Sequence, residues 1–455
     1  MLPAGRKGAL VAFRAAVYRS LGRRSDALFD LIDATSCGGA ADSLPHLSLA
    51  PVHQRRHGSV YAALRKGTLD AQQLSGVLAR HPLDAGQPAY AVDVSVVARC
   101  DAETSPCRAF YHHPSRHSAG QPIVAGWAYS WVAQLGTECS CWTAPVDAVR
   151  LDPGERAEVV AIRQVKTLAP QLAGGPVPLF VFDAGYTPSI LTLALADVRA
   201  AILVRFRDDR VFFRSAEPHP KGQGRGGRPK RHGPAFRCGD ETTWGEPDRR
   251  LEEQDAACGR VDVRCWGGLH GRVGQGPGRG RGKGRGPTQP LAVGWVVRVV
   301  LERTPNQARP LKPLWLWYAG PDPPDLALLW RAYVHRFDVE HTLRFVKERL
   351  GWDRARVRTP EQMDRWTWVI LAGYTQLRLA RGLIADQRLP WERPRPPHQL
   401  TPWRVLRGFG DLVLLLGTPA SAPKPCGRSP GRPKGSRSGR APRFPALKAA
   451  AARAA

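Results

Sequence analysis

Acidic side chains are scarce in this chain of 455 residues. Asp and Glu number 39 against 67 Lys and Arg, which gives a formal net charge of +28 and an isoelectric point near 10.6. Such an excess attracts phosphate backbones, because basic side chains release the counterions that are condensed on nucleic acid. The composition therefore indicates a nucleic-acid partner.

Long apolar runs are missing as well. No stretch reaches the roughly 18 consecutive apolar residues of a membrane-spanning helix. The segment Gly8 to Val17 is short, is interrupted by Arg14, and is not followed by a cleavage site, so it does not resemble a secretory signal. We expect a cytoplasmic, nucleoid-associated bacterial protein with no membrane partner.

The nine cysteines show no repeated paired spacing. The nearest approaches to a metal cluster are Cys139 with Cys141, and Cys258 with Cys265 and His270. Structural zinc sites use other spacings. We therefore expect reduced, mostly packed thiols rather than a zinc site.

Changes in composition and hydrophobic pattern divide the chain into five parts. Short helical patterns fill residues 1–88, and the basic cluster Arg55-Arg56-His57 makes this part a candidate DNA-end-binding domain or, alternatively, a helical cap. Apolar strands alternate with helical stretches over 89–207, which predicts an α/β core with a mixed sheet. Residues 208–321 predict a β-rich insertion with basic loops. Residues 322–385 would complete the core, and 386–455 form a Pro/Arg-rich region with a disordered basic tail.

The stretch from Ala332 to Leu350 predicts one helix with a charged face. Its apolar stripe would pack on a core and consists of Val339, Leu343, Val346 and Leu350. At about 100° per residue, four polar residues at offsets 0, 3, 7 and 14 fall within about 60° of arc beside that stripe, and Arg344 lies within about 20° of the first of them. In chain order they are Tyr333, Arg336, Glu340, Arg344 and Lys347. One carboxylate among basic side chains suits a metal ion and a polyphosphate, although ion pairs along a solvated helix explain the same pattern.

Two aspartates upstream occupy positions suited to metal-binding carboxylates. Asp93 lies within the apolar strand predicted from Ala89 to Ala98, where a carboxylate is costly to bury unless it is paired or binds metal. Asp183 follows the predicted strand Leu179 to Phe182, at a sheet edge where clefts form. A turn or a helix cap is the alternative role for Asp183. Phosphodiester cleavage with two divalent ions needs two or three carboxylates from different elements.

The spacing Tyr-x2-Arg-x3-Glu-x6-Lys resembles the Y-R-E-K signature of one group of DDE-type insertion-sequence transposases. Tyr333, Arg336, Glu340 and Lys347 fill its four positions. Together with the upstream aspartates, residues 89 to 385 look like the ribonuclease-H-like catalytic domain of these enzymes. The expected fold is therefore an α/β, ribonuclease-H-like mixed sheet with a β-rich insertion and an N-terminal helical domain.

This resemblance implies roles for individual residues. Asp93, Asp183 and Glu340 would be the catalytic, metal-binding triad, with Mg²⁺ or Mn²⁺ as the cofactor. The DNA-binding residues would be Tyr333, Arg336, Arg344 and Lys347, with Arg344 included for its place on the predicted face. The family pattern at the first acid is Asp-x-Thr, whereas this chain has Ser95, so Asp101 and Glu103 are alternatives to Asp93.

The function implied by the resemblance is DNA transposition. The enzyme would cleave double-stranded DNA at transposon ends and join the freed 3′-hydroxyl to target DNA by two-metal-ion catalysis, as a homodimer in a synaptic complex. Two other functions use the same features. A metal-dependent DNA nuclease would need the same acids, and a noncatalytic DNA-binding remnant of a transposable element would need only the basic segments.

Overall fold

The computed structural model describes most of the chain as a mixed α/β fold. The described residues are 4–37, 43–83, 86–112, 123–136, 141–216, 231–271, 290–303, 312–425, 427, 431, 433–437 and 439–448. They belong to two compact units. The first unit comprises Met1–Asp84, Val94–Glu155 and Asp338–Ala450, and the second comprises Ala85–Asp93, Arg156–Phe337 and Ala451–Ala455.

The strands form one mixed sheet of 12 strands, which confirms the predicted fold class. Its order is β2-β3-β1-β5-β6-β12-β11-β10-β7-β8, with β4 beside β3 and β9 beside β10. Strand β1 (Ala89–Ala98) is shared, because its first half belongs to the second unit and its second half to the first. The other strands of the first unit are β2 (Ala109–His112), β3 (Ile123–Gln134) and β4 (Ala144–Arg150).

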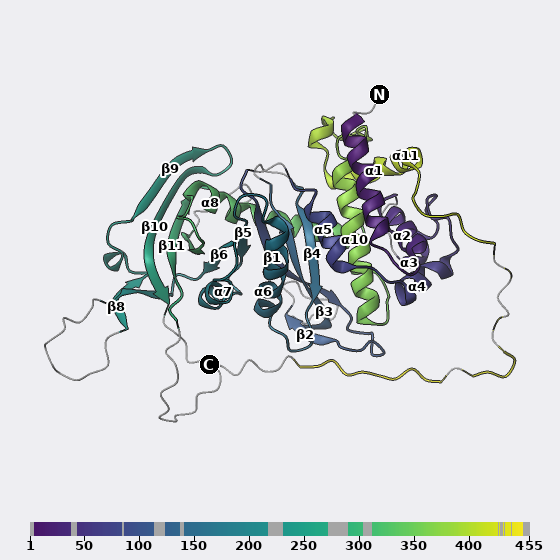
Figure 1. Ribbon diagram of the computed structural model, residues 1–455, viewed down its shortest axis with the longest axis horizontal. Helices are drawn as coiled ribbons and strands as arrows, with labels where there is room; N and C mark the ends of the chain where they lie inside the picture. Colours follow the sequence, from purple (N-terminus) through teal and green to yellow (C-terminus); the bar gives the residue numbers. More distant parts are fainter. Residues whose placement is uncertain are drawn as a thin grey trace. The chain divides into compact units, whose positions relative to one another are not determined.

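The second unit contains parallel strands that are mostly apolar. Strand β5 (Leu179–Phe182) pairs in parallel with β1 on one side and with β6 (Ala201–Phe206) on the other. All four residues of β5 are buried, as expected for a strand covered on both faces. Helices α6 (Ala157–Leu168) and α7 (Pro188–Ala194) contact each other, and α7 also packs against β6 (Figure 1).

The rest of the second unit's sheet is antiparallel and contains the predicted insertion strands. Strand β12 (Leu314–Ala319) joins β6 to β11 (Val293–Leu301), which pairs with the long strand β10 (Gly259–Gly271). The remaining strands are β7 (Val211–Ser215), β8 (His232–Arg237) and β9 (Arg249–Asp255). The sequence predicts strands at the positions of β10, β11 and β12, whereas β7, β8 and β9 and the pairing of all these strands emerge only from the structure.

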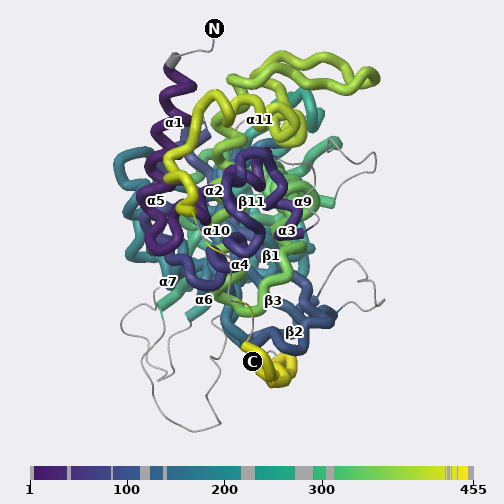
Figure 2. The backbone as a smooth tube through the Cα atoms, turned by 90° about the vertical axis from the view of Figure 1, so that its right-hand side faces the viewer, coloured from purple at the N-terminus to yellow at the C-terminus, as the bar shows by residue number. Residues whose placement is uncertain are grey.

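The first unit is organised around one buried helix, α10 (Pro360–Ala380). It begins after Thr359 with a capping box to Gln362, in which each side chain bonds the backbone of the other residue. Five of the described helices contact α10. They are α1 (Ala4–Arg19), α2 (Ser25–Cys37), α4 (His57–Lys66), α5 (Ala71–Ala79) and α11 (Pro402–Leu416). Figure 2 shows α2, α4 and α11 close to α10 in that view. Helix α3 (Leu44–Leu47) completes the N-terminal helical region, and no described helix is long and apolar enough to cross a membrane.

The prediction of a single helix from Ala332 to Leu350 is wrong. Helix α8 (Leu326–His335) ends one residue before Arg336, and α9 (Asp338–Glu348) follows after Phe337. The Arg336 amide bonds the carbonyls of Ala332 and Tyr333, which tightens the last turn of α8. Two acids, Asp338 and Glu340, then lie in the first turn of α9, where the helix dipole favours negative charge.

Because the helix is interrupted, the angle of 100° per residue does not apply between Tyr333 and Glu340. The predicted common face of these two residues therefore does not follow from helix geometry. The break also coincides with the division between units, which falls after Phe337. The apolar stripe is nevertheless confirmed, since all four of its residues are buried, namely Val339, Leu343, Val346 and Leu350. The hydrophobic period therefore predicted the buried residues of α9 correctly, but it did not predict where the helix is interrupted.

A buried ionic network holds α1 and α2 to α10. The Arg14 guanidinium forms a bidentate pair with Asp33, with an Nη2–Oδ2 distance of 2.9 Å, and also donates to Oε1 of Gln376 at 2.9 Å. Arg14 and Asp33 are each 3% exposed at the side chain. Burial raises the pKa of the Asp33 carboxyl and outweighs the guanidinium, which lowers it. Removing one partner would leave the other charge buried and unpaired.

We expect Arg14→Ala to lower the free energy of unfolding by about 3–5 kcal/mol, because the carboxylate of Asp33 would lose its counter-charge. Urea unfolding followed by circular dichroism measures the change. Lys66→Ala is the matched control, since Lys66 is exposed and should shift stability by less than about 0.5 kcal/mol. Equal stabilities for the two variants would contradict the role of the network.

Candidate functional site

The two aspartates of the predicted triad belong to neighbouring segments of the second unit. Strands β1 and β5 pair in parallel with Ala89 opposite Leu179, Tyr90 opposite Phe180, and Ala91 opposite Val181. Extending this register by two residues reaches Asp93 in β1 and Asp183, which comes directly after β5. Paired residues of a parallel sheet point to the same face, and neighbouring strands are about 4.8 Å apart. The register therefore favours a position of the two carboxyl groups on the same face of the sheet.

Asp183 has a defined local structure. It comes directly after β5, is half-buried, and accepts a hydrogen bond at Oδ1 from the Gly185 amide at 2.9 Å. A Cβ atom on Gly185 would lie 3.1 Å from that same oxygen, so glycine keeps the approach open. This hydrogen bond corresponds to the turn role that the sequence analysis gave as the alternative for Asp183. It engages Oδ1, whereas Oδ2 makes no hydrogen bond to any other residue in the described part of the chain.

Asp93 sits inside a strand rather than at the end of one. It is half-buried between Val92 and Val94 in the continuous strand β1. Ser95, which stands where the resembling family has threonine, is on the same face two residues further on and is 7% exposed. The hydroxyl is therefore part of the packed sheet beside the carboxylate.

A third charged residue extends this row and was missed by the sequence analysis. Strands β5 and β6 pair with Phe182 opposite Val204, so the next step places Arg205 opposite Asp183 on the same face. Arg205 is exposed and has no hydrogen-bond or ion-pair partner among the described residues. The available signal was a single charge in the apolar run of β6. Only the register shows that this charge lies next to Asp183.

The row Asp93, Asp183 and Arg205 has the chemistry of a site for a divalent cation and a phosphate. Mg²⁺ is commonly held by one or two protein carboxylates and keeps water or phosphate oxygens as its other ligands. A guanidinium matches phosphate oxygens in geometry and charge. Within the described residues no group of three or more His, Cys, Asp or Glu is assembled that could hold a metal ion. The donor set present is thus a carboxylate pair, which fits Mg²⁺ or Mn²⁺.

Glu340 belongs to the first unit and lies on the exposed face of α9. Glu340 and Arg344 are both exposed, whereas Lys347 is half-buried with its ammonium 5.7 Å from the Trp352 ring. The opposite face of α9 is fixed by a polar contact in the core. The hydroxyl of Thr342 lies 2.9 Å from the Thr143 hydroxyl and 3.2 Å from that of Tyr374.

Burial raises the pKa of Tyr374 to about 12, so this hydroxyl stays protonated at neutral pH and can serve as a donor. Three hydroxyl groups therefore meet in an apolar core. They belong to Thr143, which directly precedes β4, to Thr342 of α9 and to Tyr374 of α10. Buried polar groups of this kind favour one rotation of a helix over others, because any other rotation leaves them unsatisfied. The rotation of α9 about its axis is thereby fixed, and so is the direction of the exposed face that carries Glu340 and Arg344.

The structure buries the first two signature residues. Tyr333 is 1% exposed and its hydroxyl has no hydrogen-bond partner among the described residues, while Arg336 is 5% exposed. The Arg336 guanidinium lies 4.9 Å from the Phe337 ring and 6.0 Å from the Tyr333 ring. Both belong to the second unit, whereas Glu340 and Lys347 belong to the first. The roles of Tyr333 and Arg336 in binding DNA stay predictions.

The sequence model of a family described as DDE superfamily endonuclease matches residues 16–271, which is more than half of the chain. The matched range includes Asp93, Asp183 and Arg205 and ends before Glu340. No curated protein matches the chain.

The exposed Arg205 yields a prediction that compares the two ends of β6. Arg205→Ala should weaken binding of a double-stranded DNA fragment and lower the salt slope of the binding constant by about one, because one phosphate contact is lost. Arg199→Ala removes the same charge near the other end of the strand, where Arg199 bonds the carbonyls of Ala173 and Gly175. Fluorescence anisotropy over a series of salt concentrations measures both. Identical slopes for the two variants would remove Arg205 from the site.

Proposed function

The chain belongs to the DDE superfamily endonucleases, and from this premise we propose that it is an insertion-sequence transposase. It would cut double-stranded DNA at transposon ends and join the 3′-hydroxyl to target DNA, with Mg²⁺ or Mn²⁺ as the cofactor. The observation that supports the proposal is the register of β1 and β5, because extending it by two residues beyond Ala91 and Val181 brings Asp93 level with Asp183.

Glu340 would be the third carboxylate of this site. It lies on the exposed face of α9, which the Thr342 hydroxyl fixes in the core of the first unit. Divalent cations held by these carboxylates would supply Lewis-acid stabilisation of the charge that develops on phosphate oxygens.

The side chains of the site would then position the DNA for two displacements at phosphorus. In the first, water attacks a phosphodiester and the 3′-oxygen of the transposon end leaves. In the second, that 3′-hydroxyl attacks a target phosphodiester and a target 3′-oxygen leaves. Arg205 on β6 and Arg344 on α9 are exposed guanidinium groups that can bind phosphate oxygens and neutralise their charge.

The Y-R-E-K assignment adds Tyr333, Arg336 and Lys347 to the DNA-binding residues. Since Tyr333 and Arg336 are buried at the C-terminal end of α8, their contact with DNA requires the turn between α8 and α9 to open. We propose the synaptic homodimer and the nucleoid location on the same basis. They follow from what such transposases do with paired transposon ends.

The N-terminal helices would bind the transposon ends, and the structure narrows the residues available for this. In the cluster Arg55-Arg56-His57, Arg55 is half-buried and ion-paired with Asp30 and Asp26. Arg56 and His57 are exposed. Contacts with DNA from this cluster would therefore come from its last two residues.

A metal-dependent DNA nuclease is the second candidate, because the matching family is described as an endonuclease. Both activities need the same carboxylates and differ only in the second displacement. Incubation with a transposon-end fragment and a supercoiled plasmid separates them. Plasmid molecules joined to the fragment indicate a transposase, whereas cut fragments without joined products indicate a nuclease. A DNA-binding remnant would give neither.

We predict that Glu340→Gln and Asp183→Asn each abolish Mg²⁺-dependent DNA cleavage while leaving DNA affinity within about twofold, because the amide keeps the shape of the side chain and loses the charge that attracts the cation. Single-turnover cleavage of a labelled transposon-end duplex, together with anisotropy on the same duplex, measures both effects.

Asp208→Asn is the matched control, since Asp208 is an exposed acid just beyond β6 in the second unit. Its cleavage rate should equal that of the unmodified chain. Cleavage by Glu340→Gln at the rate of this control would take Glu340 out of the proposed triad, and the same result for Asp183→Asn would remove the carboxylate pair.

A further inference from the structure

The strand β2 lies at the end of the sheet path and has one edge that no named strand covers. Its residues Ala109–His112 pair with β3 on one side. Edge strands expose unpaired backbone groups and readily add another strand, from the same chain or from another molecule. In this protein the open edge of β2 is met by residues near the C-terminus.

The C-terminal segment meets β2 through its main chain. The Leu447 amide donates to the Arg108 carbonyl at 2.7 Å, and the Phe110 amide donates to the Leu447 carbonyl at 3.2 Å. These two bonds make a parallel bridge between Ala109 and Leu447. A third bond runs from the Phe444 amide to the Glu103 carbonyl at 2.7 Å. The contact with β2 is thus a single parallel bridge, with a further backbone bond at Glu103 nearby, and it has the geometry with which a parallel strand begins to add to a sheet edge.

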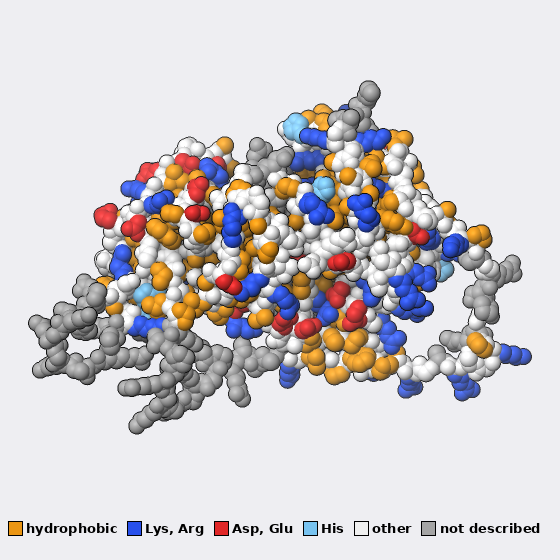
Figure 3. Space-filling view, in the orientation of Figure 1, with side chains coloured by type: hydrophobic (Ala, Val, Ile, Leu, Met, Phe, Trp, Pro, Cys, Tyr) orange, Lys and Arg blue, Asp and Glu red, His pale blue; other side chains and the backbone are white. Residues whose placement is uncertain are grey.

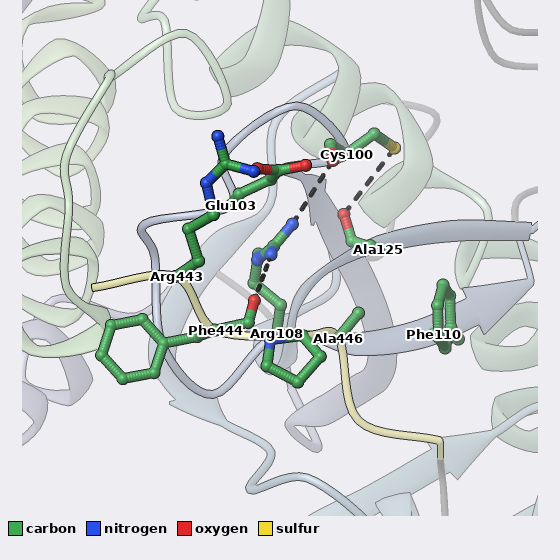
Figure 4. A pocket seen from close by; sticks show the side chains of 9 residues that line it. Cys100, Glu103, Arg108, Phe110, Ala125, Arg443, Phe444 and Ala446 are labelled. Atoms are coloured by element: carbon green, nitrogen blue, oxygen red, sulfur yellow. Dashed lines mark hydrogen bonds and ion pairs between the residues drawn. The ribbon is translucent and has the colours of Figure 1, made fainter. Parts of the chain in front are cut away.

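Arg108 forms the centre of this contact, as Figure 4 shows. Its side chain is 3% exposed and donates only to backbone carbonyls, those of Ser105, Arg99, Cys100 and Phe444. The bond to the Phe444 carbonyl is 2.7 Å long. The first three carbonyls hold the guanidinium in place within the first unit. The fourth comes from the incoming segment, so Arg108 presents a fixed donor to an extended main chain.

Side chains add little to this contact. The ion pair between Arg443 and Glu103, at 3.2 Å, has side chains 81% and 60% exposed, and pairs of this kind contribute little to stability. A cavity of about 420 Å³ is lined by residues of the segment and of the sheet, among them Phe444, Ala446 and Phe110. The segment thus covers the edge without filling the space beside it. The C-terminal segment is therefore held on β2 mainly by backbone hydrogen bonds, with few packed side chains. A contact of this kind can form and break reversibly.

We propose that the free edge of β2 is a strand-docking site and that its occupant is Arg443–Leu447 of the same chain. The chain is also anchored at Ser421, whose amide donates to Asp26 at 3.0 Å and whose carbonyl accepts from Arg55. Between these anchors, residues 422–442 contain Lys and Arg but no acid. The basic residues of this stretch that the structure describes, Lys424, Lys434, Arg437 and Arg440, are exposed, and Figure 3 shows Lys and Arg side chains along the extended segment at the lower right. Docking therefore holds a basic arm at both ends and shields a sheet edge from other strands.

The test uses hydrogen–deuterium exchange in the full chain. Leu447→Pro removes the amide that donates to Arg108, whereas Ala446→Pro, the matched control, removes an amide with no hydrogen bond in the described structure. Exchange at the Phe110 amide should be about tenfold faster in Leu447→Pro and unchanged in Ala446→Pro. A synthetic peptide with the sequence of residues 441–448 should restore protection in Leu447→Pro, and a scrambled peptide should not.

Other outcomes would overturn the proposal. Equal exchange at Phe110 in Leu447→Pro and in the unmodified chain would mean that the edge is not occupied by this segment. Protection that rises with protein concentration would place the segment on a second copy of the chain, which contradicts an arm held at both ends. Sedimentation velocity on Leu447→Pro adds an independent readout, because an uncovered edge should increase self-association.

Discussion

The parallel register of β1 and β5 is the constraint on which the candidate site depends. The pairs from Ala89–Leu179 to Ala91–Val181 fix this register, and two residues further along lie Asp93 in β1 and Asp183 just past the end of β5. Two carboxylate charges about 5 Å apart repel by about 3 kcal/mol at an effective dielectric constant near 20. A divalent cation bound by both carboxylates would offset this repulsion.

The candidate residues are divided between the two units. The second unit contains Asp93, Asp183 and Arg205. The first unit contains Glu340 on α9, whose opposite face is held in the core by the hydrogen bond between the hydroxyl groups of Thr342 and Thr143. The chain passes from one unit to the other directly after Asp93 and again between Phe337 and Asp338.

Sequence patterns predict much of the fold and part of the site. Apolar runs give the strands because β5 and β6 are buried on both faces, and the charge at the end of such a run identifies Asp183. The partner of a strand is a long-range property, so the neighbourhood of Arg205 could not be read from the chain. The break after Arg336 was missed because the apolar period continues across it. The contact between Leu447 and β2 could not be predicted from the sequence, because backbone hydrogen bonds do not require particular side chains.

The most direct test of the central claim, that Asp183 is a ligand of the catalytic ion, is a change of ligand atom. In Asp183→Cys a sulfur replaces the carboxylate, and Mg²⁺ strongly prefers oxygen, whereas Mn²⁺ accepts sulfur more readily. Single-turnover cleavage of a transposon-end duplex should fall by about two orders of magnitude in Mg²⁺ and recover substantially in Mn²⁺. Asp208→Cys should cleave like the unmodified chain with either ion. Cleavage by Asp183→Cys in Mg²⁺ at the unmodified rate would contradict the account.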